Sequence, residues 1–379
     1  MHEAVEVKKT AVISVVFSLV QAMLGCQNRS SALNNQDKLE ENESAVRAIS
    51  SNPASLAMDT EQITFIEETS RIENGFSDKE NNYFQKITSI TVDTNNNLYV
   101  ADSGVHKIFV FDENHRYRFS FGETGQATGE FLGDLRISAG NDDRLHITDD
   151  RNWRLYAFSL FGKLIDQFAI EEYLYDVPVV SSKGEVFMLS RSGVELIDIY
   201  NPQMKLIGFL MGYDDHLDFP YLRPPQMLIK RMYFPSINDV KKLITREDEL
   251  IAVSNCSQYV FHFDADKKII NKFRIEHKSF AIDYKKRLKK LASEGGWLNG
   301  FGSAFLDGKE NLCLCYYNSK LGRPEIYRYT KGGLFLDTIR TQGNAENTNQ
   351  IIAACDNKGN MFSVNSVLQS ILIYREKDE

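Results

Sequence analysis

Acidic residues end several short apolar segments of this chain, and they are its first candidates for chemistry. Asp102 ends the segment LYVAD, and Asp149 ends the segment RLHITD, where Asp150 and Arg151 follow. Carboxylates at the ends of strands can ligate a divalent cation or accept hydrogen bonds from a polar ligand. They can also accept backbone hydrogen bonds inside a tight turn. We favour the turn role for Asp102 and Asp149 but keep both as candidate ligand-binding residues.

Aromatic side chains are the second group of candidates. Trp153 lies in the same segment as Asp149, whereas Tyr213, Tyr221 and Trp297 lie in two long stretches described below. Flat aromatic rings beside acids and arginines suit a sugar or a peptide. For Trp153 and Trp297, covering the hydrophobic core is the alternative. The candidate ligand-binding residues are Asp102, Asp149, Asp150, Arg151, Trp153, Tyr213, Tyr221 and Trp297.

Histidines and cysteines show no spacing that indicates catalysis or a metal site. The seven histidines fall at unequal places, and no Cys-x-x-Cys pair or nucleophile with a nearby base is evident. We therefore predict no catalytic residue, no metal ligand and no cofactor, and leave a Ca²⁺ or other divalent ion on the axis as the alternative. Cys313 and Cys315 alternate with leucines, as small core residues do, and a disulfide to Cys355 stays open.

These residues must be positioned by a pair of short strands that recurs along the chain. The segment NLYVADSGVHKIFVFD, residues 97–112, returns in five further versions that start near residues 144, 185, 249, 311 and 360. A leading strand precedes most copies and a third strand tends to follow. Four short antiparallel strands repeating every roughly 40 to 50 residues are typical of a β-propeller blade. The sequence therefore predicts an all-β fold, a six-bladed β-propeller of four-stranded antiparallel blades.

The ends of the repeat array predict how the ring closes. The last copy lacks an outermost strand, and an extra strand, QITFI at residues 62–66, precedes the first copy. We expect this N-terminal strand to complete the last blade, because a closed ring leaves no bare sheet edge there. Two long insertions, 211–248 and 276–300, separate consecutive copies and should share a face with Asp102 and Asp149. Binding is expected on that face, near the axis.

The first residues predict export. Lys8 and Lys9 precede an apolar run at 11–24, and Gly25 and Cys26 end it. This pattern indicates a lipoprotein-type signal peptide over 1–25 with Cys26 as the lipidated residue, and ordinary secretion is the alternative. Residues 26–60 are polar and predict a flexible tether, so the propeller occupies 61–379. Gln27 after Cys26 favours an outer-membrane lipoprotein facing the periplasm over one at the cell surface.

The hairpins resemble NHL repeats, in which an acid ends one strand, an Asn lies in the turn and a basic residue opens the next strand. The segment DDRNWRLYAF, residues 149–158, matches best, whereas the first copy keeps Asp102 and Lys107 but has Val105 in place of Asn. Together with the signal, the chain is similar to six-bladed propeller lipoproteins of the Bacteroidetes type. Because some six-bladed propellers are metal-dependent hydrolases or lyases, this resemblance implies such an enzyme as the alternative function.

The charge of the chain excludes one class of partner. A formal net charge of −8, from 44 basic and 52 acidic residues, argues against a general nucleic-acid binder. A basic run at 285–290 is interpreted as the solvated face of a helix, with an anionic partner as the alternative. The sequence thus predicts a membrane-anchored binding protein without catalysis. Its expected partners are a glycan, a peptide or an envelope protein, and only its lipid anchor contacts the membrane.

Overall fold

The structure is a computed structural model. It describes residues 62–76, 83–170, 176–190, 195–212, 240–254, 258–275, 277, 280, 301–318, 321–341 and 351–377. The chain divides into two units, Met1–Ser51 and Asn52–Glu379, and all described residues belong to the second. The predicted signal peptide, the tether and Cys26 lie outside the described residues. Within those residues, no helix has the length and apolar character needed to cross a membrane.

The described residues form 24 β-strands, and most are four to seven residues long. In chain order they are β1 (Ile63–Ile72), β2 (Ile87–Val92), β3 (Leu98–Asp102), β4 (Lys107–Phe111), β5 (Tyr117–Phe121), β6 (Leu135–Ala139), β7 (Arg144–Asp149), β8 (Arg154–Ser159), β9 (Leu164–Ala169), β10 (Val179–Val180), β11 (Val186–Leu189), β12 (Glu195–Tyr200), β13 (Leu206–Gly212), β14 (Val240–Ile244), β15 (Leu250–Ser254), β16 (Tyr259–Phe263), β17 (Ile269–Arg274), β18 (Ser303–Leu306), β19 (Leu312–Asn318), β20 (Arg323–Tyr329), β21 (Phe335–Thr341), β22 (Ile351–Cys355), β23 (Met361–Asn365) and β24 (Ser370–Glu376). Strand β14 lies inside the stretch 211–248, so that stretch is not wholly an insertion.

The strands pair into five sheets. Four of them are four-stranded, follow the chain order and contain β2–β5, β6–β9, β10–β13 and β14–β17. Neighbouring strands within these sheets are antiparallel, as Leu98↔Phe111 and Asp102↔Lys107 illustrate for β3 and β4. The fifth sheet has eight strands in the order β18-β19-β20-β21-β1-β24-β23-β22. The predicted all-β class and the four-stranded antiparallel unit are thus confirmed.

Strand β1 joins the two ends of the described chain. It pairs antiparallel with the last strand, β24, through Ile66–Ile72, so the predicted pairing of an N-terminal strand with the last unit is confirmed. Its first residues, Ile63–Ile66, pair in parallel with β21. The strand is thus longer than the predicted strand of residues 62–66. Its parallel pairing with β21 also merges two blades, predicted to be separate, into one hydrogen-bonded sheet.

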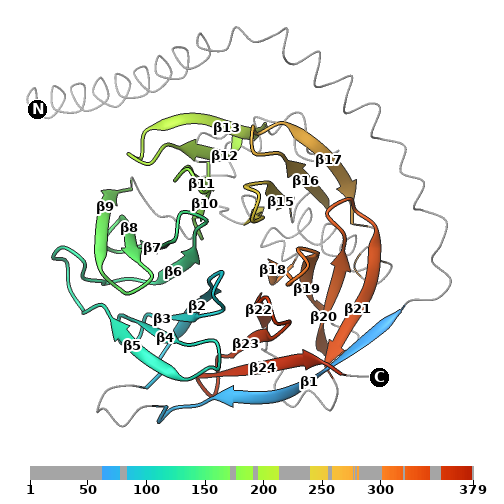
Figure 1. The fold of residues 1–379 in the computed structure, drawn as a ribbon, viewed down its shortest axis with the longest axis horizontal. Coiled ribbons are helices and arrows are strands. Elements are labelled where there is room, and N and C mark those ends of the chain that lie inside the picture. The colour runs from blue at the N-terminus through green and yellow to red at the C-terminus, as the bar shows by residue number, and fades with distance from the viewer. Residues whose placement is uncertain are drawn as a thin grey trace, which may run out of the picture. The chain divides into compact units, whose positions relative to one another are not determined.

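The sheets follow one another in chain order around a central axis, and β1 lies beside β24 in the ring (Figure 1). The innermost strands are β2, β6, β10, β14, β18 and β22, and each lies next to the innermost strands before and after it. The last of them, β22, lies next to the first, β2, which closes the ring. This arrangement is a β-propeller.

Hydrophobic side chains fill the spaces between neighbouring sheets. For example, Tyr99 and Ile108 of the first four-stranded sheet pack with Leu145 and Tyr156 of the second. Similar clusters join the other neighbouring groups of strands around the ring. Burial of these apolar faces stabilises the ring as a whole, because no sheet can cover its own two faces. Cys313 and Cys315 lie in one such cluster as free thiols, the core role that was predicted.

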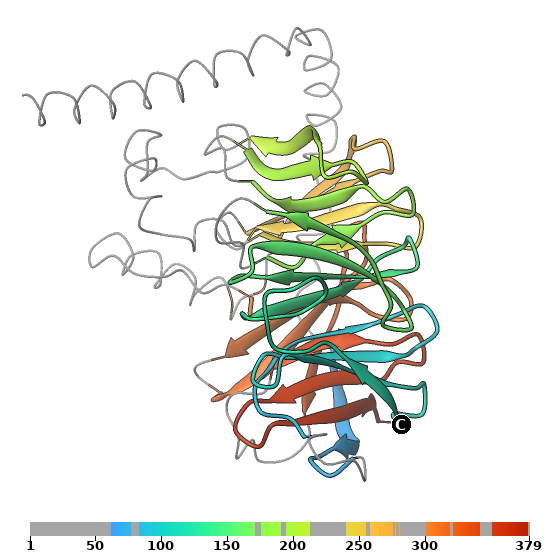
Figure 2. The same cartoon turned by 90° about the vertical axis from the view of Figure 1, so that its left-hand side faces the viewer.

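The strands run between two opposite faces of the ring (Figure 2). We call one the connection face: it carries the links between sheets and the turns joining the second and third strands of each sheet, such as β3–β4 and β7–β8. We call the other the turn face: it carries the turns joining the first and second strands, such as β2–β3 and β6–β7. Asp102 and Asp149 lie on the connection face.

Candidate binding site on the connection face

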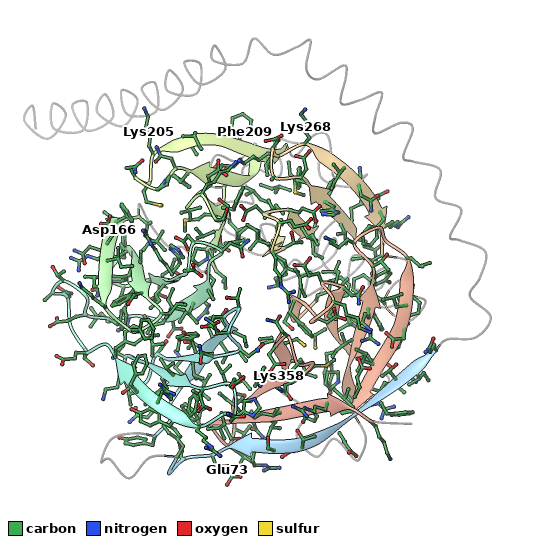
Figure 3. All side chains as sticks on the ribbon, viewed as in Figure 1. Glu73, Asp166, Lys205, Phe209, Lys268 and Lys358 are labelled. Carbon is green, nitrogen blue, oxygen red and sulfur yellow. The ribbon has the colours of Figure 1, made fainter. Side chains whose placement is uncertain are left out.

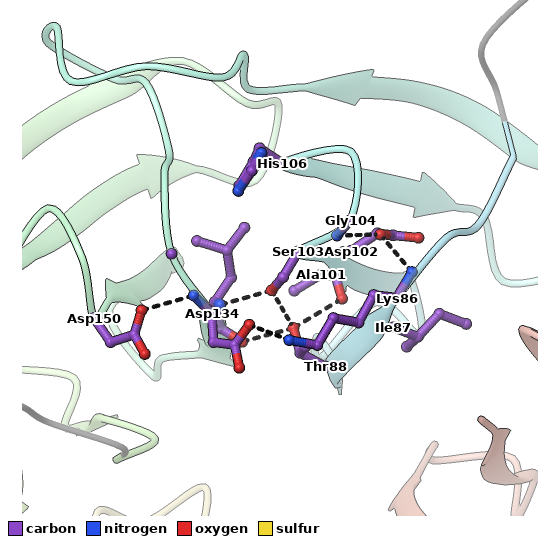
Figure 4. A network of polar contacts seen from close by, with 12 residues as sticks. Lys86, Ile87, Thr88, Ala101, Asp102, Ser103, Gly104, His106, Asp134 and Asp150 are labelled. Carbon is purple, nitrogen blue, oxygen red and sulfur yellow. Dashed lines mark hydrogen bonds and ion pairs between the residues drawn. The ribbon is translucent and has the colours of Figure 1, made fainter.

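Asp102 is fully buried at the end of β3. Its carboxylate accepts hydrogen bonds from the backbone N–H groups of Gln85 at 2.6 Å and Lys86 at 2.9 Å, which belong to the segment entering β2. It also accepts a bond from Gly104 in the β3–β4 turn at 2.8 Å (Figure 4). Val105 of the same turn donates to it at 3.3 Å. The side chain therefore fixes the turn to the incoming segment.

Asp149 repeats this arrangement in the next sheet. Its carboxylate accepts bonds from the backbone N–H groups of Leu132 at 2.7 Å and Gly133 at 2.9 Å, and from Arg151 at 3.1 Å and Asn152 at 3.0 Å. A Cβ atom on Gly133 would lie 2.0 Å from Asp150 Oδ1, so this close approach requires glycine. These bonds correspond to the turn role that the sequence favoured for both acids.

Other hairpins in the described part of the chain keep the same turn even where the acid is missing. Asn365 uses its side-chain oxygen to accept bonds from the backbone N–H groups of Val367 and Leu368, as Asp149 does at the equivalent places. In five of the hairpins, the residue four places after the position of the acid has a positive φ. These residues are His106, Trp153, Gln258, Gly322 and Gln369. The later copies whose turns the structure describes thus depart from the NHL pattern in residue type but preserve the turn geometry.

Of the remaining candidates, the structure brings Asp150, Arg151 and Trp153 together in the β7–β8 turn. Asp150 is half-buried and accepts a bond from the backbone N–H of Asp134 at 2.7 Å, while Arg151 is exposed. Trp153 is 43% exposed. Asp134 also pairs with Lys86 at 2.6 Å, which links this group to the hairpin of Asp102 (Figure 4). Tyr213, Tyr221 and Trp297 lie outside the described residues.

Apolar residues exposed on the connection face were missed by the sequence analysis. Val367 is 68% exposed, Leu368 54% and Leu321 49%, and all three lie in turns between the second and third strands of their sheets. Tyr317 lies near the end of β19, and Tyr83 and Val177 lie on links that enter innermost strands. The dipeptide Val367–Leu368 in a turn was the available signal, since turns favour polar residues and glycine.

Two buried histidines pair with carboxylates near the turn face. His146 Nε2 lies 3.0 Å from Asp142 Oδ1, and His262 Nε2 lies 3.2 Å from Glu249 Oε2. Burial lowers the pKa of His262 below its ordinary value, although the charge of Glu249 opposes this. No group of three or more His, Cys, Asp or Glu suited to a metal ion occurs within the described ranges.

The turns on the turn face are bonded to one another, including turns of sheets that are not neighbours. Asn141 Nδ2 donates to Thr245 O at 2.7 Å and to Asp248 Oδ1 at 2.8 Å, and Asp248 also accepts from the backbone of Ser182. Arg246 bonds to both Glu310 and Asn357. Asn357 accepts the bond from Arg246 through its side-chain oxygen and donates its backbone N–H to Asn96 Oδ1 at 2.9 Å. Turns of all six innermost strands are thereby joined.

One segment of the chain matches the model of a known repeat family. Residues 84–111, which contain β2, β3 and β4, match the NHL repeat. The protein brain tumor of Drosophila melanogaster is 24% identical over 109 residues. That match covers 28% of this chain and 10% of the fly protein, so the chain spans a small part of that relative's length.

Solved structures are similar to this chain over most of its length. A protein of Bacteroides fragilis superposes with a TM-score of 0.52 and 11% identity, over 83% of this chain and all of that one. Virginiamycin B lyase of Staphylococcus aureus gives a TM-score of 0.48 and 9% identity, over 81% of this chain and 99% of that one. The first likeness supports the fold alone. The chain is thus a β-propeller in which residues 84–111 match the NHL repeat.

Proposed function

We propose that this protein is an exported, membrane-anchored six-bladed β-propeller that binds a glycan, a peptide or an envelope protein without catalysis. Binding takes place on the connection face near the axis. The residues assigned to the site are the predicted candidates of that face together with the exposed apolar residues of its turns.

The count of six blades is supported by the ring of six innermost strands, β2, β6, β10, β14, β18 and β22. Within the eight-stranded sheet, β18–β21 form one antiparallel group, and β22–β24 with β1 form another. Only the parallel pairing of β1 with β21 joins the two groups. We therefore count each group as one blade.

The observation that carries the binding proposal is the difference between the two faces. Turns on the connection face expose Trp153, Leu321, Val367 and Leu368 to solvent. On the turn face, the turns of the innermost strands are bonded to one another, and the exposed apolar residues Phe161 and Leu334 lie in turns of the outer strands. Exposed apolar groups that lie side by side, as Val367 and Leu368 do, are typical of an interaction surface. Because Asp102 and Asp149 already accept four backbone bonds each, apolar contacts contribute the greater part of the affinity in this proposal.

A binding screen tests this proposal. The Asn52–Glu379 unit would be applied to glycan and peptide arrays beside a variant carrying Trp153→Ser, Leu321→Ser and Leu368→Ser. Loss of bound ligands in the variant is expected, whereas Phe161→Ser, at a residue that is 85% exposed in the β8–β9 turn on the opposite face, should change nothing. Ligands held equally by all three proteins would reject the connection face as the site.

A thermal-shift series with Ca²⁺, Mg²⁺ and Zn²⁺ separates binding from the metal-dependent hydrolase or lyase. An ion that binds only the folded protein raises its melting temperature by mass action. No shift is expected for a protein that binds without a metal, and a clear shift with a stoichiometric ion would favour the enzyme.

Anchoring is proposed through a lipid on Cys26, at the outer membrane and facing the periplasm. The charged and apolar pattern of residues 1–25 supports export. Incorporation of labelled fatty acid into the expressed protein, and its loss in Cys26→Ala, is the expected result. Label retained in that variant would contradict the assignment.

A further inference from the structure

The outermost strands of the sheets are where another chain could add. In the four-stranded sheets these are β5, β9, β13 and β17, each hydrogen-bonded within its sheet on one side only. An outer strand offers unpaired backbone N–H and C=O groups, and natural proteins protect such edges with charged side chains. An outer strand without charged side chains is therefore the edge most open to another chain.

Three of the four strands carry charge. Strand β5 contains Arg118, β9 contains Asp166, and β17 contains Lys272 and Arg274. Strand β13, with the sequence LIGFLMG, contains no charged residue. Two of its large apolar side chains are solvent-exposed, Ile207 by 53% and Phe209 by 39%. Phe209 points outward from the ring (Figure 3).

The local geometry of β13 permits close approach of another strand. Gly208 has no side chain beside Phe209, and a Cβ atom built there would meet only Ile199 Cδ1, at 3.8 Å. The register of β12 and β13 shifts between Ile199 and Tyr200, after which Ile199↔Gly208, Asp198↔Phe209 and Ile197↔Leu210 pair regularly. A regular, uncharged segment thus occupies the middle of the exposed edge.

The protein itself shows that an outer strand of this ring can accept a further strand. Strand β21 is the outermost member of its antiparallel group, and Ile63–Ile66 of β1 pair along its outer side. This pairing covers the edge of β21 by main-chain bonds over only four residue pairs. An equally short segment is available on β13.

We propose that β13 pairs antiparallel with β13 of a second copy of this chain, about a two-fold axis close to Phe209. Such an isologous contact places the same strand on both sides, so neither copy brings a charge into the new strand pair. This matters because each chain carries a formal net charge of −8, which opposes association through charged surfaces. Phe209 of each copy then packs across the pair as a cross-strand apolar contact.

The mass of the Asn52–Glu379 unit in solution tests the proposal. Light scattering coupled to size exclusion should give twice the chain mass at high concentration and a decline toward the single mass on dilution. Phe209→Lys should abolish the doubled mass, while Ile165→Lys on the edge of β9 should retain it. Ile165 is 46% exposed and serves as a matched site on an edge that already carries Asp166.

A cross-link tests the register. Phe209→Cys should form a disulfide-linked dimer under mild oxidation, because residues opposed near a two-fold axis lie within disulfide range. Ile165→Cys should not. A single chain mass at every concentration overturns the proposal, as does a doubled mass that Phe209→Lys leaves intact. Binding of an extended peptide to a unit that stays single would also overturn it, in favour of a different partner at the same edge.

Discussion

Asp149 shows how one side chain determines the shape of a turn. Replacing it with Asn keeps the size but leaves one acceptor oxygen for four backbone N–H groups. We expect Asp149→Asn to lower the free energy of unfolding by about 1–3 kcal/mol, because buried donors lose their partners. Urea unfolding followed by circular dichroism measures this change.

The neighbouring acid gives the control for that measurement. Asp150 is partly exposed and accepts one backbone bond from Asp134, so Asp150→Asn should cost less than Asp149→Asn. If both variants unfold like the unaltered protein, the turn does not depend on the carboxylate, and a ligand role for Asp149 gains support.

His115 gives the folded protein a dependence on pH. Its ring packs edge-on against Phe362, and Nε2 is buried with no hydrogen-bond partner in the described part of the chain. Burial lowers the pKa of His115 below its ordinary value, although Asp356 opposes the shift. Below the unfolded-state pKa of about 6.5, the unfolded chain therefore binds more protons than the folded one, and stability falls as the pH falls.

We predict that His115→Asn weakens this pH dependence. Asn tolerates the left-handed backbone found at this position, where φ is 62°. The free energy of unfolding should be measured from neutral pH down to a pH just above 4.5, since Glu249, whose pKa is lowered from 4.5, adds its own acid dependence below that point. His262 should leave a residual slope in the variant. Equal slopes in both proteins would show that His115 does not titrate differently on folding.

At the residue scale, sequence reasoning predicted the position of the acids and favoured their turn role, but it did not predict their bonding partners. The short, mostly apolar segments before Asp102 and Asp149 indicated strands that end at these acids. The backbone groups that bond these carboxylates could not be predicted. Gln85 precedes Asp102, and Leu132 precedes Asp149, by 17 residues, so each pair comes close only in the folded protein. The exposed turn residue Leu368 was missed because its residue type alone does not distinguish it from a core leucine; only its place in a turn does.

Strand β1 is the element that depends most on distant parts of the chain. Arg328 of β20 bonds Asp337 of β21 at 2.6 Å and Glu376 of β24 at 2.5 Å, and Thr64 of β1 donates to the same Asp337. Burial alone would lower the pKa of Arg328, but the bonds and charge of Asp337 raise it. This ionic group holds together the strands on both sides of β1.

A pair of substitutions tests the packing of β1. Ile66 is 1% exposed and lies in a hydrophobic cluster with Ile326 and Leu372, whereas the adjacent Phe65 is 42% exposed. Ile66→Ala should lower the free energy of unfolding by about 2–5 kcal/mol. Phe65→Ala should cost much less despite removing a larger side chain. Similar losses in the two variants would mean that β1 does not pack as described, and thermal unfolding monitors both.

The length of β1 illustrates a limit of pattern reading. After Ile66 the strand continues as EETSR, whose residues are polar and exposed, so no alternation of apolar residues marks it as a strand. Its backbone pairing with β24 alone defines it. Apolar alternation gives no signal where a strand segment is exposed along its whole length, as this one is.

The whole molecule is a ring whose ends meet, and this closure was predictable because the copy number and the missing last strand are visible in the sequence. The merging of two groups of strands into one sheet was not, since it depends on where β1 lies relative to β21. Hydrophobic clusters between neighbouring sheets make each sheet depend on the next. Weakening one junction should therefore lower the stability of the whole ring in a single cooperative transition.

A circular permutation tests whether strand pairing or chain connection closes the ring. A chain running from Tyr83 to Lys377, followed by a glycine-serine linker and residues 62–76, moves β1 to the C-terminal end beside its partner β24. Because the entropy of closing a loop changes slowly with its length, we expect the free energy of unfolding to stay within about 1 kcal/mol of the natural order. The same chain without residues 62–76 should be strongly destabilised, since it loses the buried Ile66 and Ile72 and leaves β24 as a bare edge. If the permuted chain is as unstable as the shortened one, the connection from β1 to β2, and not the pairing of β1 with β24, holds the ring closed.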